Sequence, residues 1–138
     1  MRDIASLYKP YQLIAPIAMT ATVTGSGVLV APQEDSDAVA IANFGAVAGS
    51  PTSFTAIVTI EGSDTSGGTY SVLSTFATAT AGAQIGTKQV IIPIASKTYV
   101  RAKVTIAFVG GTTPSFVCGV SLLVKQNINT SSNQTALA

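Results

Sequence analysis

The sequence predicts an all-β protein built as an antiparallel β-sandwich, with an extended N-terminal arm and a C-terminal tail. The clearest observation is the stretch 99–125, where apolar residues alternate with other residues at the period of two that half-buried strands show. Gly110, Gly111 and Pro114 interrupt this stretch and predict a turn, so its two strands are expected to form an antiparallel hairpin. Shorter β-prone segments recur upstream, separated by residues typical of turns.

The N-terminal part is interpreted as an arm followed by a small hairpin. Pro10 and Pro16 are incompatible with a continuous helix or a central strand, so residues 1–20 are expected to form an extended arm. Two short β-prone segments, 20–24 and 28–31, flank the turn-forming Gly25-Ser26-Gly27 and are expected to pair with each other.

Four further segments are predicted between the arm and the long C-terminal stretch. Residues 38–44 are apolar throughout, as in a strand buried on both faces, and a loop is expected over 45–53. Residues 54–61 alternate clearly, and 69–76 resume the β pattern after a turn, which predicts a hairpin. The segment 77–86 is expected to be a loop that crosses between sheets.

The last upstream strand and the tail complete the predicted organisation. Residues 89–94 are expected to form a strand at an edge, because Pro93 cannot donate a ladder hydrogen bond. Residues 126–138 have no periodicity and should be disordered when taken alone. The expected organisation is therefore an arm over 1–20, a sandwich domain over 21–125 and a tail over 126–138.

The composition is that of one domain with few charges. The chain has 138 residues, of which 9% are charged, and its formal net charge is +1. Ordinary soluble domains contain about 25% charged residues, so a free monomer of this kind would be prone to associate. We therefore expect neighbouring chains to cover much of the surface; a compact domain with an exterior of Thr, Ser and Ala is the alternative. The small net charge also argues against nucleic-acid binding.

No export signal or membrane span is expected. Asp3 and the lack of an apolar run behind Arg2 are unlike a secretory signal. The uncharged window 38–60 is interrupted by polar residues, glycines and Pro51, which argues against a membrane helix. The single cysteine, Cys118, excludes an internal disulfide and lies in an apolar row, so it is expected in the core. These features favour assembly in a reducing cytoplasm.

The residue types that catalysis and metal binding need are sparse. The chain has no histidine, so neither a Ser-His-Asp nor a Cys-His arrangement can form, and we expect no enzymatic activity. Ser96 and Lys97 are better explained as a turn than as a catalytic pair, because adjacent strand residues point to opposite faces. Glu34, Asp35 and Asp37 lack the ligand spacing of a calcium loop. We expect no metal site and no other cofactor.

Acidic and basic residues fall in separate blocks of the chain. The acidic block precedes the basic one: Glu34, Asp35, Asp37, Glu61 and Asp64, then Lys88, Lys97, Arg101, Lys103 and Lys125. In a sandwich, such blocks are expected to form opposite patches that meet across subunits and set the register of an assembly. Solvated loops and strand faces without a partner are the alternative.

Several of these segments together resemble a known family. An alternating strand leads at Ile60 into an EGSD turn that ends at Asp64. GGTY at 67–70, KTYVRAKVTI at 97–106 and, after a Gly-Gly-Thr turn, GVSLLVK at 119–125 follow. This succession, over residues 54–125, is similar to the small capsid cement, or decoration, proteins of tailed bacteriophages. The resemblance implies a jelly-roll-like sandwich that forms dimers or trimers on the outside of an icosahedral head. It also implies binding to adjacent major capsid protein subunits, with no catalytic residues to carry over.

The expected function is therefore that of a structural virion protein on the capsid exterior, assembled in the host cytoplasm. Its expected partners are the major capsid protein and further copies of itself, as a homodimer or homotrimer, without nucleic acid or membrane. Contacts are expected at aromatic or charged residues outside the predicted core: Tyr8, Tyr11, Asp35, Arg101 and Lys103. A virion fibre, tail or adhesin module that binds a host glycan or receptor is the alternative.

Overall fold

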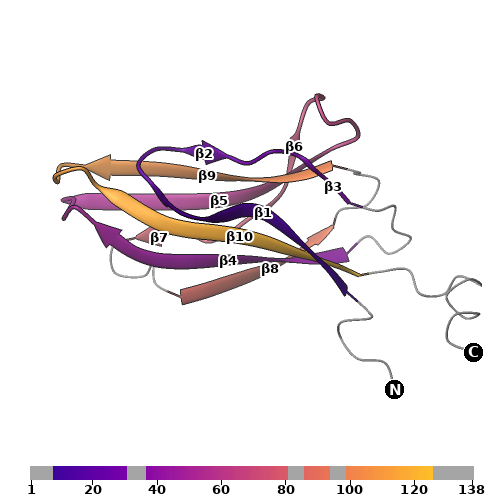
Figure 1. The fold of residues 1–138 in the computed structure, drawn as a ribbon, viewed down its shortest axis with the longest axis horizontal. Coiled ribbons are helices and arrows are strands. Elements are labelled where there is room, and N and C mark those ends of the chain that lie inside the picture. The colour runs from indigo at the N-terminus through magenta and orange to yellow at the C-terminus, as the bar shows by residue number, and fades with distance from the viewer. Residues whose placement is uncertain (1–7, 31–36, 81–85, 94–98, 126–138) are drawn as a thin grey trace, which may run out of the picture.

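The computed structural model of the protein describes residues 8–30, 37–80, 86–93 and 99–125, which form strands and turns without a helix (Figure 1). The strands are β1 (Tyr8–Met19), β2 (Val23–Thr24), β3 (Val28–Leu29), β4 (Asp37–Ala48), β5 (Ser53–Ser63), β6 (Ser71–Thr75), β7 (Ala79–Thr80), β8 (Gly86–Pro93), β9 (Tyr99–Val109) and β10 (Ser115–Lys125). They form two antiparallel sheets that pack against each other. The all-β sandwich predicted from the sequence is confirmed.

Each sheet is organised around one strand of the long C-terminal stretch. Sheet A is four-stranded, in the order β1-β10-β4-β8, and sheet B is six-stranded, in the order β2-β9-β5-β6. In sheet B, β3 also pairs with β9 and β7 also pairs with β5. The last two strands of the chain, β9 and β10, are therefore inner strands of opposite sheets.

The expected hairpin over 99–125 is wrong, because β9 and β10 do not pair with each other. The turn at 110–114 carries the chain from sheet B to sheet A, so the apolar rows of the two strands face each other across the core. The alternating pattern fits both arrangements, since each places one apolar face inward. The connection from β4 to β5 crosses between the sheets in the same way.

These two crossing turns bind each other at one end of the sandwich. The amide of Thr112 donates to the carbonyl oxygen of Gly49 at 2.9 Å, and the amide of Thr52 donates to the carbonyl oxygen of Val109 at 2.7 Å. Gly49 and Gly111 have φ values of +82° and +84°, a left-handed conformation that glycine adopts without steric cost. Their backbones are in such close contact that a side chain on either would collide with the other turn.

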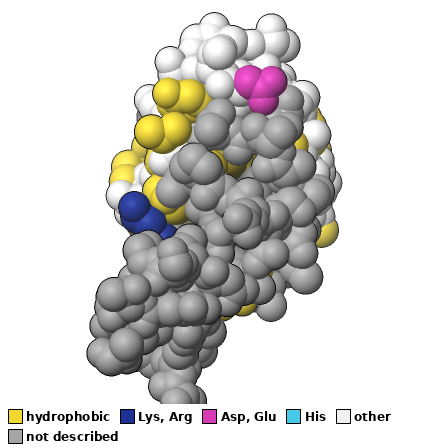
Figure 2. Space-filling view, turned by 90° about the vertical axis from the view of Figure 1, so that its right-hand side faces the viewer, with side chains coloured by type: hydrophobic (Ala, Val, Ile, Leu, Met, Phe, Trp, Pro, Cys, Tyr) yellow, Lys and Arg dark blue, Asp and Glu magenta, His cyan; other side chains and the backbone are white. Residues whose placement is uncertain are grey.

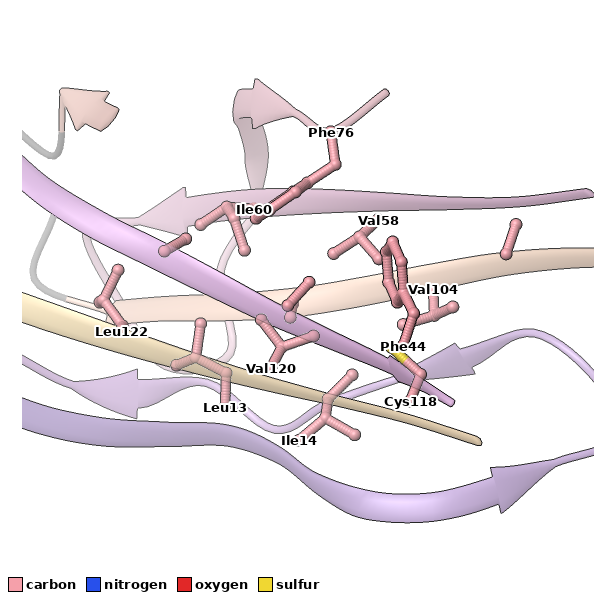
Figure 3. Packing of buried hydrophobic residues seen from close by; sticks show 14 of the residues in the cluster. Leu13, Ile14, Phe44, Val58, Ile60, Phe76, Val104, Cys118, Val120 and Leu122 are labelled. Carbon is pink, nitrogen blue, oxygen red and sulfur yellow. The ribbon is translucent and has the colours of Figure 1, made fainter. Parts of the chain in front are cut away.

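The core lies between the sheets and is lined by alternate residues of the long strands (Figure 3). Beside the crossing turns, Phe116 lies against Phe44 and Phe54, with ring centroids 5.5 Å and 4.7 Å away. Cys118 is buried next along β10, as expected from the sequence. Burial raises the pKa of its thiol from 9.0 to about 12.

The expected arm over 1–20 needs correction over residues 8–19, which form β1 at the edge of sheet A. Pro10 and Pro16 are tolerated there because an edge strand has a ladder partner on one side only. The register with β10 shifts between Gln12 and Ile14, and both Leu13 and Ile14 are buried in the core. Residues 1–7 and the tail 126–138 lie outside the described residues.

Two other expectations are also corrected. The strands β2 and β3 do not pair with each other; both pair with β9, so they are successive parts of one edge of sheet B. The segment 38–44 belongs to a longer strand, β4, which continues to Ala48 through part of the expected loop. The β5–β6 hairpin and the edge position of β8 are confirmed.

Candidate functional site

The outer face of sheet B is polar and is lined largely by threonines. Thr75, Thr59 and Lys103 form one cross-strand row over β6, β5 and β9, and Thr80 and Thr55 pair in another. All of these side chains are exposed or half-buried. This face therefore presents hydroxyl groups and charge, and sheet B also carries the exposed apolar residues Leu29, Val72 and Val109.

A charged cluster stabilises one end of the same face. Nε of Arg101 donates to Oε1 of Glu61 at 2.7 Å, across register partners of β9 and β5. The ring of Tyr70 covers the guanidinium, with its centroid 4.0 Å from Cζ, which is a cation–π geometry. The hydroxyl of Tyr70 donates to the carbonyl oxygen of Ser66 at 3.0 Å. Gly27 packs so closely on Tyr70 that a Cβ there would meet its hydroxyl.

The outer face of sheet A is different in character. Leu123 and Val39 are cross-strand neighbours on β10 and β4, and Ile41 lies beside Ser121 in the next row. These apolar side chains are half-buried, and Val117, further along β10, is 41% exposed. The three strand segments that build this face, 10–18, 39–47 and 115–123, contain no charged residue. We call this surface the apolar face of sheet A.

The corner of sheet A where β1 begins and β10 ends carries charged residues. Tyr8 and Lys125 are register partners, so the described chain enters and leaves sheet A at one corner. Figure 2 views this end and shows, among the described residues, hydrophobic atoms together with basic and acidic side chains. The described ends of β1, β4 and β10 hold Lys9, Asp37 and Lys125, so charge lies at the borders of sheet A and not within the apolar segments of its outer face.

The residues expected to make contacts do not form one surface. Tyr8 and Tyr11 are half-buried on β1, and Nζ of Lys9 lies 5.3 Å from the centroid of the Tyr11 ring. Arg101 and Lys103 lie on the outer face of sheet B. Asp35 lies outside the described residues.

The expected meeting of acidic and basic blocks across subunits also needs correction at one pair. Glu61 comes from the acidic block and Arg101 from the basic one, yet they bind each other within one chain. The pairing of β5 with β9 in sheet B brings the two blocks together, which the order of the residues in the sequence does not reveal.

The apolar face of sheet A was not among the contact residues inferred from the sequence. The sequence nevertheless indicates this face, because 38–44, interpreted above as an apolar run, has Asn43 as its one polar residue. That pattern predicts a strand covered on both faces. Within one chain only the inner face is fully covered: Ala38, Ala40 and Ala42 are buried, while Val39 and Ile41 are partly exposed.

The described residues offer little for metal chemistry. Among them, no three His, Cys, Asp or Glu side chains gather in a group that could hold a metal ion. The same part of the chain contains no helix of the length and hydropathy that a membrane span requires. The notable features of the described structure are therefore its surfaces, one apolar and one rich in hydroxyl groups.

Comparison of the chain with family models, with curated proteins and with solved structures finds no match.

Proposed function

We propose that the protein is a structural virion protein that binds the outside of an icosahedral phage head and cements adjacent major capsid protein subunits. The observation that carries this proposal is the difference between the two outer faces. The outer face of sheet A presents Val39, Ile41, Val117 and Leu123, and its segments 10–18, 39–47 and 115–123 hold no charged residue. Sheet B presents threonines and charged groups, together with the separate exposed residues Leu29, Val72 and Val109. An exposed apolar face is typical of a surface that a protein partner covers.

In this proposal the apolar face of sheet A lies on the shell and the outer face of sheet B faces the solvent. The strand order supports the jelly-roll-like topology that the resemblance implies. If β2 with β3 and β6 with β7 each count as one strand, every connection except β5–β6 crosses between the sheets: β1–β2, β3–β4, β4–β5, β7–β8, β8–β9 and β9–β10. A double-sheet jelly roll has eight strands arranged in two such sheets.

The mode of action needs no catalysis and no cofactor. Each copy adds a modest buried area at a joint between shell subunits, and many copies act together over the head. Homo-oligomers would bridge more than one joint at a time. The charge-poor sequence favours such association, because little electrostatic repulsion opposes it.

The test is attachment to heads assembled from the major capsid protein of the same genome. Labelled protein should bind preformed or expanding heads at a fixed ratio to the shell subunit. Val117→Lys introduces a charge at an exposed position of the apolar face and should weaken attachment about tenfold or more, because a charge must be desolvated on docking. Thr105→Lys, at an exposed position of sheet B, is the matched control and should attach normally. Equal attachment of both variants would reject the proposed orientation.

The alternative is a fibre, tail or adhesin module that binds a host glycan or receptor. The exposed hydroxyl groups of Thr55, Thr75 and Thr80 on sheet B favour it, since hydroxyl groups can bind sugars. A glycan-array signal or host-cell adsorption by the purified protein, lost in a Thr55→Val, Thr75→Val variant, would support this reading over the first.

A further inference from the structure

A sandwich of two open sheets has four edges, and exposed edges bind other strands unless they are blocked. In this protein the edges are β1 and β8 in sheet A, and β2 with β3 and β6 with β7 in sheet B. Three of these four edges carry features that obstruct a further strand. The fourth, β8, carries none of these features, although β6 of the other sheet lies close to it without pairing.

The β1 edge is obstructed by prolines and by irregular pairing. Pro10 and Pro16 have no amide hydrogen to donate to an added strand. The register of β1 with β10 also shifts between Gln12 and Ile14, and again between Ile14 and Ile17. Such irregularities interrupt the straight row of donors and acceptors that a new strand needs.

Both edges of sheet B are broken into short pieces. The strands β2 and β3 have two residues each, and Gly25, between them, already donates its amide to Ala102 at 2.8 Å. On the other side, β6 has five residues and β7 has two, and the register of β6 with β5 shifts between Ile60 and Glu61. Neither edge offers a long, regular ladder.

The β8 edge is continuous and regular. The strand has eight residues, Gly86–Pro93, and each of them pairs with β4 without a register shift. Its only proline is the last residue. Among the residues that the structure describes, no strand pairs with its other side, and Figure 1 shows β8 at the margin of the sandwich. Within the described part of the chain, its outward amide and carbonyl groups therefore form a row of donors and acceptors that no strand uses.

We propose that the free edge of β8 binds the same edge of a second copy of this chain, antiparallel, so that the two A sheets become one continuous sheet. This inference rests on the self-association in the proposed function and names β8 as the strand through which two copies associate. A strand that pairs antiparallel with its own copy is related by a two-fold axis, which closes the assembly as a dimer.

The sequence of β8 suits self-pairing. Lys88 is its single charged residue. With the two-fold axis at Val90, Lys88 lies opposite Ile92 of the other copy and not opposite its own equivalent. Like charges directly opposite each other would destabilise the pair, and this register avoids them. The apolar positions Val90, Ile91 and Ile92 favour strand formation at the centre of the contact.

The experiment measures the mass of the purified full-length chain by sedimentation equilibrium over a wide concentration range. The wild-type chain should be a dimer. Successive residues of an antiparallel edge strand direct their amides to opposite sides, so Val90→Pro and Ile91→Pro differ in what they remove. The variant that loses an amide bonded to β4 should be destabilised. The variant that loses an amide at the free edge should keep the thermal unfolding transition of the wild type, but its dimer should be at least about tenfold weaker.

Two further measurements keep the inference testable if neither proline variant folds. Val72→Lys changes an exposed residue on the β6 edge and should leave the dimer intact. Amide hydrogen exchange of the wild-type chain should show protection of alternate β8 amides at high concentration that is lost on dilution, because those amides are bonded only in the dimer.

The outcomes separate this inference from the proposed function. A wild-type chain that stays monomeric, a folded proline variant that still dimerises, or β8 protection that is independent of concentration would overturn the β8 contact. Failure to attach to heads, with the β8 dimer intact, would reject the cement function and leave this inference standing.

Discussion

Arg101 and Glu61 bind each other across the two inner strands of sheet B, with Nε and Oε1 2.7 Å apart. Only 29% of the Arg101 side chain and 11% of the Glu61 side chain are exposed to solvent. The ring of Tyr70 covers the guanidinium and joins the β5–β6 turn to the pair. The cluster therefore stabilises the sheet, and Arg101 is not a free positive charge available to a partner.

Replacing Arg101 by leucine should leave the Glu61 carboxylate largely buried without its charge partner. We expect the free energy of unfolding to fall by about 2–3 kcal/mol, measured by urea denaturation. Lys103→Leu, on the same face of β9, is the control and should change it by less than about 0.5 kcal/mol. A double variant with Glu61→Leu should recover part of the loss; equal losses for Arg101→Leu and Lys103→Leu would contradict the role of the pair.

Gly111→Ala should destabilise the contact between the two crossing turns. The φ of Gly111 is +84°, and an added Cβ would lie 2.6 Å from the carbonyl oxygen of Gly49 and 2.9 Å from the backbone of Pro51. The left-handed conformation and the collision together should lower the unfolding free energy by about 2 kcal/mol or more. Gly67→Ala is the matched control, because nothing lies within 4 Å of the added atom. Similar midpoints for the two variants in thermal unfolding would argue against this account.

Phe116→Ala should remove the ring at the centre of the aromatic group near the crossing turns. Phe116 is fully buried between Phe44 and Phe54, so the substitution leaves a cavity and should cost about 3–5 kcal/mol. The adjacent Val117→Ala changes an exposed residue of the same strand and should cost less than about 1 kcal/mol. Calorimetry of both variants would measure the difference, and a small effect at Phe116 would contradict the packing.

Cys118 should make the protein less stable at alkaline pH. Burial raises its pKa from 9.0 in the unfolded chain to about 12 in the folded one, so the folded state holds the thiol proton more tightly. The protonated thiol stabilises the folded state fully below about pH 9. Above that pH the free energy of unfolding falls by on the order of 1 kcal/mol per pH unit until about pH 12. The difference in unfolding free energy between the wild type and Cys118→Ala should shrink over this range. A constant difference would reject the effect.

The sequence was sufficient for the class of fold but not for its connections. The alternation around Val104 and Val120 predicts two strands with one buried face each, and both exist. Whether two such strands pair in one sheet or face each other across a core depends on the path of the turn, which Gly110 and Gly111 permit in either form. Pro10 and Pro16 were likewise correct indicators of a peripheral segment, yet they did not distinguish an arm from an edge strand.

The candidate surfaces were only partly predictable from the sequence. The charge of Arg101 suggested a contact with another molecule. In the fold, however, Arg101 binds Glu61 of the same chain, which lies forty residues away in the sequence. The apolar run that contains Val39 and Ile41 indicated cover on both faces. Only the arrangement of β4 beside β10 shows that these residues join Leu123 in one continuous exposed face.

The place of β10 in sheet A has a consequence for how the chain is made. This strand, the last to leave the ribosome among those described, lies between β1 and β4, which do not pair with each other. The strand β1 therefore pairs only with residues that lie 97 positions (Met19 with Phe116) to 117 positions (Tyr8 with Lys125) downstream. Synthesis up to the end of β9 leaves sheet A without the strand that joins β1 to β4, so this sheet can form only after β10 has been made.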